Sequence, residues 1–292
     1  MNTGRVVATF GKHCLVQVNE TIVDCVSRGR KADIACGDQV EFKVTSPGNG
    51  VVERVQPRRN LLYRSDPFKV KNFAANLDQV LVVTAAEPGL NEDLLNRCLV
   101  AAQAAGIPAC IVLNKTDLAP TAALHAYLKA YEAIGYRLLP VSAKNDVSPL
   151  LPLLAGKTSV LIGPSGVGKS TLVNALVPEA DVRTADISRA LNAGRHTTTH
   201  TRLYELPGGG ALIDSPGMQE FGLHHLGLDE LQAAFPEFKP LLGRCRFYNC
   251  RHLKEPDCAI TAATTGGGIL PARLKAYQTL AGERLAAGQL HK

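Results

Sequence analysis

A glycine-rich segment in the middle of the chain has the residue types and spacing of a loop that binds phosphate groups. It reads Gly163, Pro164, Ser165, Gly166, Val167, Gly168, Lys169, Ser170, Thr171. Glycines allow successive backbone N–H groups to face phosphate oxygens, and the lysine reaches the β- and γ-phosphates of a nucleotide. Because such a lysine contacts the transferred group, Lys169 is predicted to be catalytic, and the Ser170 hydroxyl is predicted to bind Mg²⁺.

An upstream tetrapeptide has the residues that distinguish guanine from adenine. The Asp117 carboxylate can accept hydrogen bonds from N1–H and the 2-amino group of guanine, and adenine offers neither donor. We expect Asn114 to brace this loop and the stem of Lys115 to cover the ring, with Thr116 completing the GTP-binding segment. A backbone N–H near guanine O6 is expected from a second run, Ser142, Ala143, Lys144. These residues disfavour a P-loop ATPase or a nucleotide kinase.

The order of these two motifs along the chain is unusual. In an ordinary GTPase the phosphate-binding loop comes first, whereas here Asn114–Asp117 precedes Gly163–Ser170. This order indicates a circular permutation of the GTPase core, in which the chain enters the same arrangement at a different strand.

Two more segments fit a nucleotide switch. Asp214 begins an Asp-x-x-Gly sequence, in which the carboxylate would hold Mg²⁺ through water and the Gly217 N–H would sense the γ-phosphate. In the threonine-rich run of residues 194–200 we expect Thr198 to close over Mg²⁺ and to take part in catalysis. An ordinary polar loop is the alternative interpretation of that run.

Met218 stands where many GTPases place a glutamine that orients the attacking water. A methionine cannot orient water, so hydrolysis is predicted to be slow unless another group assists. His196 is our candidate for this catalytic role and His200 is the second. The alternative is that both are loop histidines that face solvent.

A cluster near the C-terminus has the ligands of a zinc site. It comprises Cys245, Cys250, His252, Cys258. Three thiolates and one imidazole fill a tetrahedral Zn²⁺ shell and leave no position for water, so the predicted site is structural. The alternative is a set of reduced side chains without a metal. Basic residues in the same loop favour a surface that faces nucleic acid.

The elements expected around these motifs divide the chain into three domains, giving a multi-domain α/β fold class. Residues 1–58 contain five short β-branched segments, typical of an OB-type barrel that binds RNA. Residues 59–222 alternate buried strands and helices, as in a parallel α/β sheet. Residues 223–292 are predicted to form a helical zinc-binding domain. Three side chains of its last helix, which begins at Pro271, are expected to face inward: Leu274, Tyr277, Leu285.

Charge and composition indicate the compartment and the kind of partner. The net charge is +6, and residues 1–76 hold 12 Lys/Arg against 7 Asp/Glu. This excess favours an anionic partner such as RNA, with solvated surface charge as the alternative.

Apolar runs stay well below the ~18 residues of a membrane span, and residues 1–13 lack a signal-peptide pattern. We therefore expect a cytoplasmic monomer that has no membrane contact. Its other cysteines are expected to be buried thiols: Cys14, Cys25, Cys36, Cys98, Cys110.

Taken together, these motifs resemble the small-ribosomal-subunit-dependent GTPases, the RsgA/YjeQ group, over essentially the whole chain. The resemblance implies a GTPase that binds the small ribosomal subunit and its rRNA, is activated by it, and acts late in its maturation. It also implies one structural Zn²⁺, and Mg²⁺ bound with GTP. A GTP-sensing clamp that binds nucleotide without useful turnover is the second function class, and Met218 favours it.

Overall fold

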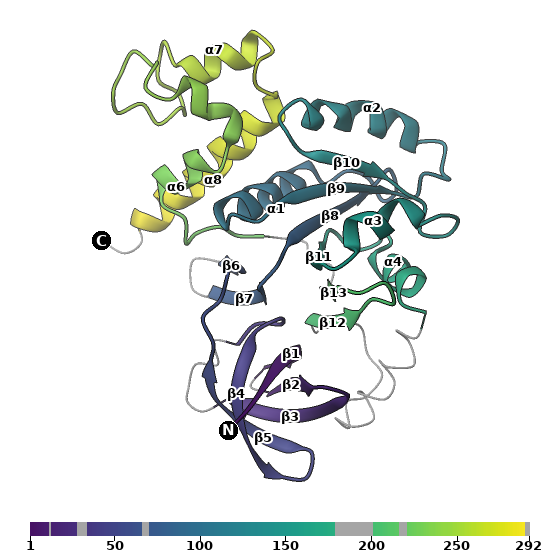
Figure 1. Ribbon diagram of the computed structural model, residues 1–292. Coiled ribbons are helices and arrows are strands. Elements are labelled where there is room, and N and C mark those ends of the chain that lie inside the picture. The colour runs from purple at the N-terminus through teal and green to yellow at the C-terminus, as the bar shows by residue number, and fades with distance from the viewer. Residues whose placement is uncertain (12, 28–33, 66–69, 179–200, 216–220, 290–292) are drawn as a thin grey trace.

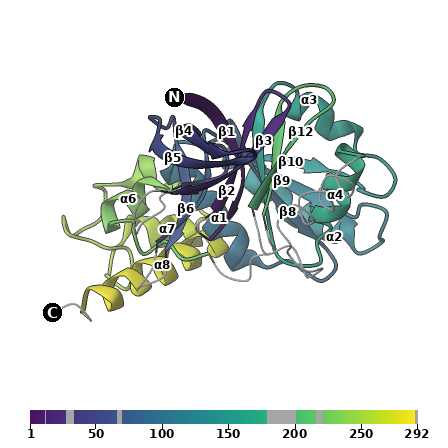
Figure 2. The same ribbon diagram turned by 90° about the horizontal axis from the view of Figure 1, so that it is seen from below.

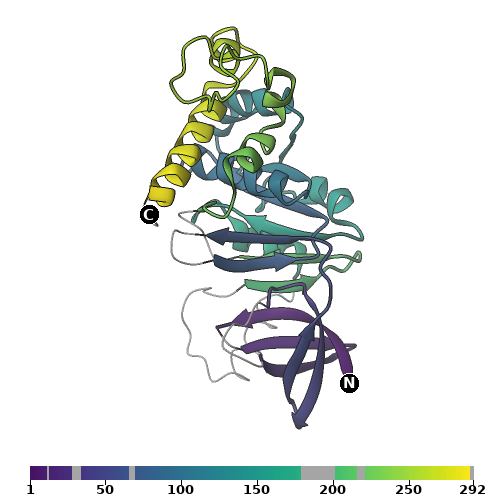
Figure 3. The same cartoon turned by 90° about the vertical axis from the view of Figure 1, so that its left-hand side faces the viewer.

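The computed structural model describes residues 1–11, 13–27, 34–65, 70–178, 201–215 and 221–289. Three tiers are visible: a barrel at the N-terminus, a sheet with helices in the middle, and a helical unit at the C-terminus (Figures 1 and 3). The expectation of a multi-domain α/β chain with an OB-type barrel is confirmed. Among the described helices, none is long and apolar enough to cross a membrane.

The N-terminal barrel is closed by five strands. They are β1 (Asn2–Phe10), β2 (His13–Val18), β3 (Thr21–Ser27), β4 (Gln39–Ser46) and β5 (Asn49–Val55). Strands β1 and β4 pair antiparallel and β3 and β5 pair parallel, which closes the order β1-β2-β3-β5-β4 on itself. Inward-facing side chains alternate along each strand and form a core of their own: Val6, Cys14, Val16, Val23, Cys25, Val40, Phe42, Val52. Figure 2 shows this barrel from below.

A hairpin that was not predicted follows the barrel. It consists of β6 (Leu61–Ser65) and β7 (Val70–Ala75), which pair antiparallel with each other. This stretch falls within the residues assigned to the α/β domain, and its charged residues obscure the apolar positions Leu62, Phe73 and Ala75, which are buried. The hairpin links the barrel to the central sheet.

The central sheet contains β8 (Gln79–Ala85), β9 (Ala109–Asn114), β10 (Arg137–Pro140), β11 (Thr158–Ile162), β12 (Thr201–Glu205) and β13 (Ala211–Asp214). Its order is β10-β9-β8-β11-β13-β12, parallel except for β12. Every residue of β8 is buried, as expected for a strand covered on both faces. Val80 and Val82 pack in the core on one face of the sheet, and Leu81 and Val83 pack in the core on the other face. This follows because successive side chains of a strand point to opposite faces.

Helices cover both faces of this sheet. The first layer has α1 (Glu92–Ala104) and α2 (Thr121–Glu132); the second has η1 (Ser148–Leu150), α3 (Leu151–Leu154) and α4 (Lys169–Leu176). Helix α1 begins where the Asn91 side chain accepts a hydrogen bond from the Leu94 N–H, and acidic residues fill its first turn.

The barrel and the central sheet are joined by strand pairing. Strand β1 pairs antiparallel with β12, with Ala8 opposite Arg202 and Thr9 opposite Thr201. The Arg5 guanidinium also donates a hydrogen bond of 2.8 Å to the Thr158 hydroxyl on β11. One sheet of 11 strands therefore runs from the barrel through the nucleotide-binding core.

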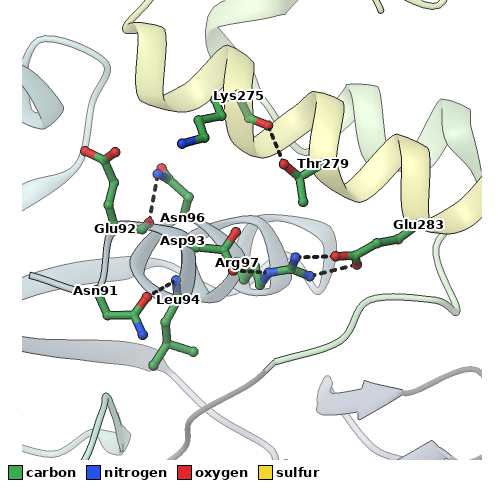
Figure 4. A network of polar contacts seen from close by, with 9 residues as sticks. All are labelled: Asn91, Glu92, Asp93, Leu94, Asn96, Arg97, Lys275, Thr279 and Glu283. Carbon is green, nitrogen blue, oxygen red and sulfur yellow. Dashed lines mark hydrogen bonds and ion pairs between the residues drawn. The ribbon is translucent and has the colours of Figure 1, made fainter.

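The C-terminal unit packs on α1. It contains α6 (Leu228–Ala233), η2 (Pro236–Leu241), α7 (Ala259–Thr265) and α8 (Pro271–Gln289). In Figure 4, the Arg97 guanidinium on α1 faces Glu283 on α8, with an N–O distance of 2.9 Å, and its Nε donates to Asp93 at 2.7 Å. Leu274 and Tyr277 are buried as predicted, whereas Leu285 is only half-buried because it lines a surface groove.

Candidate functional site

A cavity of about 620 Å³ lies at the carboxyl ends of the parallel strands. Open α/β sheets bind ligands at this edge because the loops that leave neighbouring strands converge there. Twelve of the predicted GTP-site residues line it: Asn114, Lys115, Asp117, Ala143, Lys144, Ser165, Gly166, Gly168, Lys169, Ser170, Thr171, Asp214. The fold thus brings the two motifs together although they are about 50 residues apart in the chain.

The phosphate-binding loop requires glycine at its close approaches. Gly168 has φ +94°, and a Cβ there would lie 2.4 Å from the Asn114 amide nitrogen. A Cβ on Gly163 would lie 2.3 Å from the Val83 carbonyl oxygen. Any side chain at either position would therefore push the loop off β8 or off the base-reading segment.

The Lys169 side chain lies inside this loop. Its ammonium donates hydrogen bonds of 2.8 Å to the Gly163 carbonyl and 2.9 Å to the Pro164 carbonyl. Burial lowers the pKa of this ammonium, while the nearby Asp214 carboxylate acts to raise it. The ammonium is therefore held at the loop by two neutral acceptors, which an anionic phosphate would replace favourably.

Asp214 presents an unpaired carboxylate oxygen to the cavity. Its Oδ1 is buried and has no hydrogen-bond partner among the described residues. Burial raises the pKa of this carboxyl to about 6, although the charge of Lys169 lowers it in part. An orphaned oxygen of this kind, with the Ser170 hydroxyl lining the same cavity, fits a hydrated Mg²⁺ ion.

Asn114 connects three parts of the cavity wall. Its Nδ2 donates to the Val167 carbonyl at 2.8 Å, and its Oδ1 accepts from the Ala143 N–H at 3.0 Å. The amide side chain therefore ties the phosphate-binding loop to the 142–144 loop. The Ala143 N–H, which was expected to contact guanine O6, donates its hydrogen bond to Asn114 in this structure.

The Asp117 carboxylate is oriented by its neighbour. The Ser142 hydroxyl donates to Asp117 Oδ1 at 2.6 Å, and this hydrogen bond lowers the pKa of the carboxyl. Lys115 has φ +63°, and its ammonium donates to the Glu87 carbonyl at 2.9 Å. The aspartate therefore stays ionised as a double acceptor, and the lysine stem is held along one side of the cavity.

The remaining predicted residues fall into two groups. Five support the cavity wall without lining it: Thr116, Ser142, Gly163, Pro164, Val167. His196, Thr198 and Gly217 lie outside the described residues, as do His200 and Met218.

Sequence reasoning missed three residues that line the cavity, Glu87, Leu118 and Ser215. Glu87 follows the carboxyl end of β8, and that position in a parallel strand is the signal that could have identified it.

A second cluster, in the loop of residues 244–258 (the zinc loop), has the geometry of a tetrahedral metal site. His252 Nδ1 lies 3.5 Å from the sulfurs of Cys245 and Cys250 and 3.3 Å from that of Cys258. The sulfurs of Cys245 and Cys258 are 3.9 Å apart. Zinc bonds of about 2.0–2.3 Å put tetrahedral ligands roughly 3.5–3.8 Å from one another. The cluster is therefore compatible with one Zn²⁺ ion.

The five other cysteines are buried and free, as predicted: Cys14, Cys25, Cys36, Cys98, Cys110. Burial raises the pKa of their thiols, to about 11 for Cys25 and Cys110. They therefore act as packing groups in the cores.

A parallel core entered out of the usual order, with a phosphate loop and a guanine-reading motif at one cavity, defines a circularly permuted GTPase. A family model described as RsgA GTPase matches residues 55–224. The chain belongs to the RsgA GTPase family and is a GTP hydrolase of ribosome biogenesis.

Relatives and solved structures agree with this assignment. A protein from Burkholderia pseudomallei (strain K96243) named "Small ribosomal subunit biogenesis GTPase RsgA" is 52% identical over 287 residues, covering 96% of this chain and 91% of that protein. A protein of the same name from Nitrosospira multiformis is 50% identical, covering 95% and 89%. The crystal structure of YjeQ from Thermotoga maritima has a TM-score of 0.71 at 29% identity, covering 97% and 98%. The structure of YloQ, a circularly permuted GTPase, has a TM-score of 0.68 at 27% identity, covering 98% and 96%.

Proposed function

We propose that this protein binds the small ribosomal subunit through its rRNA, hydrolyses GTP to GDP and phosphate there, and acts in late maturation of the subunit. The observation that carries the proposal is that Asp117 and Lys169 line the same cavity. The names of the curated relatives support the ribosomal part. Cytoplasmic location is part of this proposal, because a protein that acts on ribosomal subunits must reach them there.

Guanine is recognised by Asp117 in this proposal. Its carboxylate accepts from N1–H and the 2-amino group, and the Ser142 hydroxyl keeps one oxygen in place. The Lys115 stem covers the ring, and guanine O6 faces the loop of Ala143 and Lys144. Adenine has neither donor and would leave the acceptors of the Asp117 carboxylate unmatched, so ATP binds far more weakly.

The phosphates bind the loop of residues 163–171. Lys169 leaves the carbonyls of Gly163 and Pro164 and contacts the β- and γ-phosphates. Ser170 and Thr198 would hold Mg²⁺ directly and Asp214 would hold it through water, and the bound ion would supply positive charge to balance the negative charge developing on the phosphates. The Gly217 N–H senses the γ-phosphate.

His196 positions the attacking water in this proposal, because Met218 cannot. We expect slow turnover of GTP alone and strong stimulation by purified small subunits. The His196→Ala variant should lose most of the stimulation with little change in GTP affinity, since the imidazole acts in the transition state. His125→Ala, on α2, is the matched control. Full stimulated turnover in His196→Ala would transfer the role to His200 or to a ribosomal group.

A GTP-dependent clamp is the second candidate function, and Met218 favours it. The same assay separates the two. Multiple-turnover hydrolysis on small subunits supports the enzyme, whereas GTP-dependent subunit binding without turnover supports the clamp.

The barrel and the zinc loop are the proposed RNA contacts. Zn²⁺ would hold the zinc loop in shape through Cys245, Cys250, His252 and Cys258. With four protein ligands it takes no part in hydrolysis. The basic residues of both regions are suited to the RNA backbone.

A further inference from the structure

A second hollow of about 640 Å³ lies in the C-terminal unit, apart from the nucleotide cavity. It is bounded by α6, α8 and residues 248–251 of the zinc loop, and we call it the C-terminal groove. Its floor includes Tyr277, whose hydroxyl donates to the Arg251 carbonyl at 3.0 Å. Gln232 from α6 reaches the same hydroxyl at 3.4 Å. The groove is thus built on a floor held by hydrogen bonds.

An aromatic side chain stands unburied at the rim of this groove. Tyr248 has a relative exposure of 102%, so none of its side-chain surface is buried in the folded chain. Two residues further along the chain, Cys250 is one of the four proposed zinc ligands, which fixes the backbone that carries the ring. An exposed aromatic ring carried by a braced backbone segment is suited to stacking against a flat partner.

Cationic groups line the same groove. Arg251 and Arg284 are both among its walls, and no hydrogen bond from either guanidinium is found among the described residues. Arg246, by contrast, is paired with Asp257 at 2.8 Å. Among the lining residues that the structure describes, Asp229 is the one with a carboxylate. The groove therefore offers two arginines to an anion and one ring to a base.

We propose that the C-terminal groove holds an unpaired nucleotide of RNA, with its base stacked on Tyr248 and its phosphate bound by Arg251 and Arg284. Stacking requires an open base face, which a paired helix does not offer, so a single-stranded segment is the partner. The proposal rests on the proposed ribosomal function and adds a base-stacking site to it.

The chain offers a direct reporter of stacking because it contains no tryptophan. Tyr248→Trp places a single indole at the rim of the groove. Titration of the full-length zinc-loaded variant with a single-stranded RNA of about twelve nucleotides should quench its fluorescence, because a stacked base contacts the ring. A duplex of equal length should quench it little. Tyr127→Trp, at an exposed tyrosine on α2, is the matched control.

Affinity for the same RNA gives the second measurement. Tyr248→Ala should weaken binding of the single strand about 5- to 100-fold. Tyr248→Phe should retain binding within about twofold, since the ring is kept. Unchanged zinc content and intrinsic GTP turnover would show that the variants are folded.

Three results would overturn the proposal: no quenching of Tyr248→Trp by the single strand, equal weakening of single-strand and duplex binding in Tyr248→Ala, or quenching by an acidic peptide but not by RNA. If small subunits fail to stimulate turnover of the wild-type protein, the proposed function fails, and the RNA titration still decides the groove.

Discussion

At the scale of single residues, specificity for guanine depends on one carboxylate. Asp117→Asn replaces an acceptor by an amide donor, which opposes the 2-amino group of guanine and matches the 2-oxo group of xanthine. We expect GTP affinity to fall roughly 10- to 100-fold and the affinity for xanthosine triphosphate to rise, measured by calorimetric titration. Asp257→Asn is the control, since this exposed residue has φ +54°, which asparagine tolerates. Unchanged GTP affinity in the Asp117→Asn variant would show that Asp117 does not recognise guanine.

Asp214 predicts how nucleotide binding depends on pH. Burial raises the pKa of its carboxyl to about 6, so the empty site is protonated below that pH and ionised above it. Mg²⁺ requires the ionised Asp214 carboxylate. Where the carboxyl group is protonated, binding of the ion must displace its proton. Affinity for Mg²⁺–GTP should therefore fall as pH drops from 7.5 to 5.5.

The Asp214→Asn variant provides the comparison for this pH series. It should bind Mg²⁺–GTP weakly at both pH values, because the amide does not titrate. A wild-type affinity that stays flat across pH 6 would mean that Asp214 is ionised in the empty site.

At the scale of elements, the zinc loop is expected to depend on its metal because residues 244–258 contain no helix or strand. Cys250→Ala should abolish stoichiometric zinc and expose the backbone of residues 245–258 to hydrogen exchange. Helix α8 should exchange less, since Tyr277 and Leu280 belong to the same core as α1. GTP binding should survive. Cys110→Ala, a buried thiol outside the cluster, should keep its zinc. A wild-type protein purified without zinc would contradict the site.

At the scale of the whole molecule, both appended units are attached next to the segments expected to switch. Strand β12, which pairs with the barrel, begins at Thr201, directly after the threonine-rich run. The chain after Gly217 re-enters the described structure at Phe221, which is 1% exposed in the core shared with α1 and α8. The chain that continues from Gly217 is therefore one of two attachments of the C-terminal unit, the other being its packing on α1.

The ion pair between Arg97 and Glu283 tests that second attachment (Figure 4). Arg97 is buried, so Arg97→Ala leaves Glu283 without its partner and should destabilise docking of α8 by about 2 kcal/mol. Chemical denaturation with hydrogen exchange of α8 measures this. Lys275→Ala, at an exposed position of α8, should stay within about 0.5 kcal/mol of wild type. Equal effects of the two changes would mean that the pair does not support docking.

Features that depend on short spacings could be predicted from the sequence. Glycines before Lys169, the carboxylate of Asp117 and the ligand set around His252 each define their chemistry within a few residues. Strand and helix periods likewise predicted the barrel and the central sheet, because burial on one or two faces leaves a local pattern.

Pairings between distant segments could not be predicted from the sequence and are known from the fold. The contact of β1 with β12, the hydrogen bond from Ala143 to Asn114 and the pair of Arg97 with Glu283 join residues up to about 190 positions apart. Such contacts depend on how whole layers pack, and any exposed arginine or edge strand has many possible partners. The C-terminal groove follows the same rule, since its walls come from α6, α8 and the zinc loop. These three segments lie next to one another because the C-terminal unit packs on α1, and no local sequence pattern indicates this arrangement.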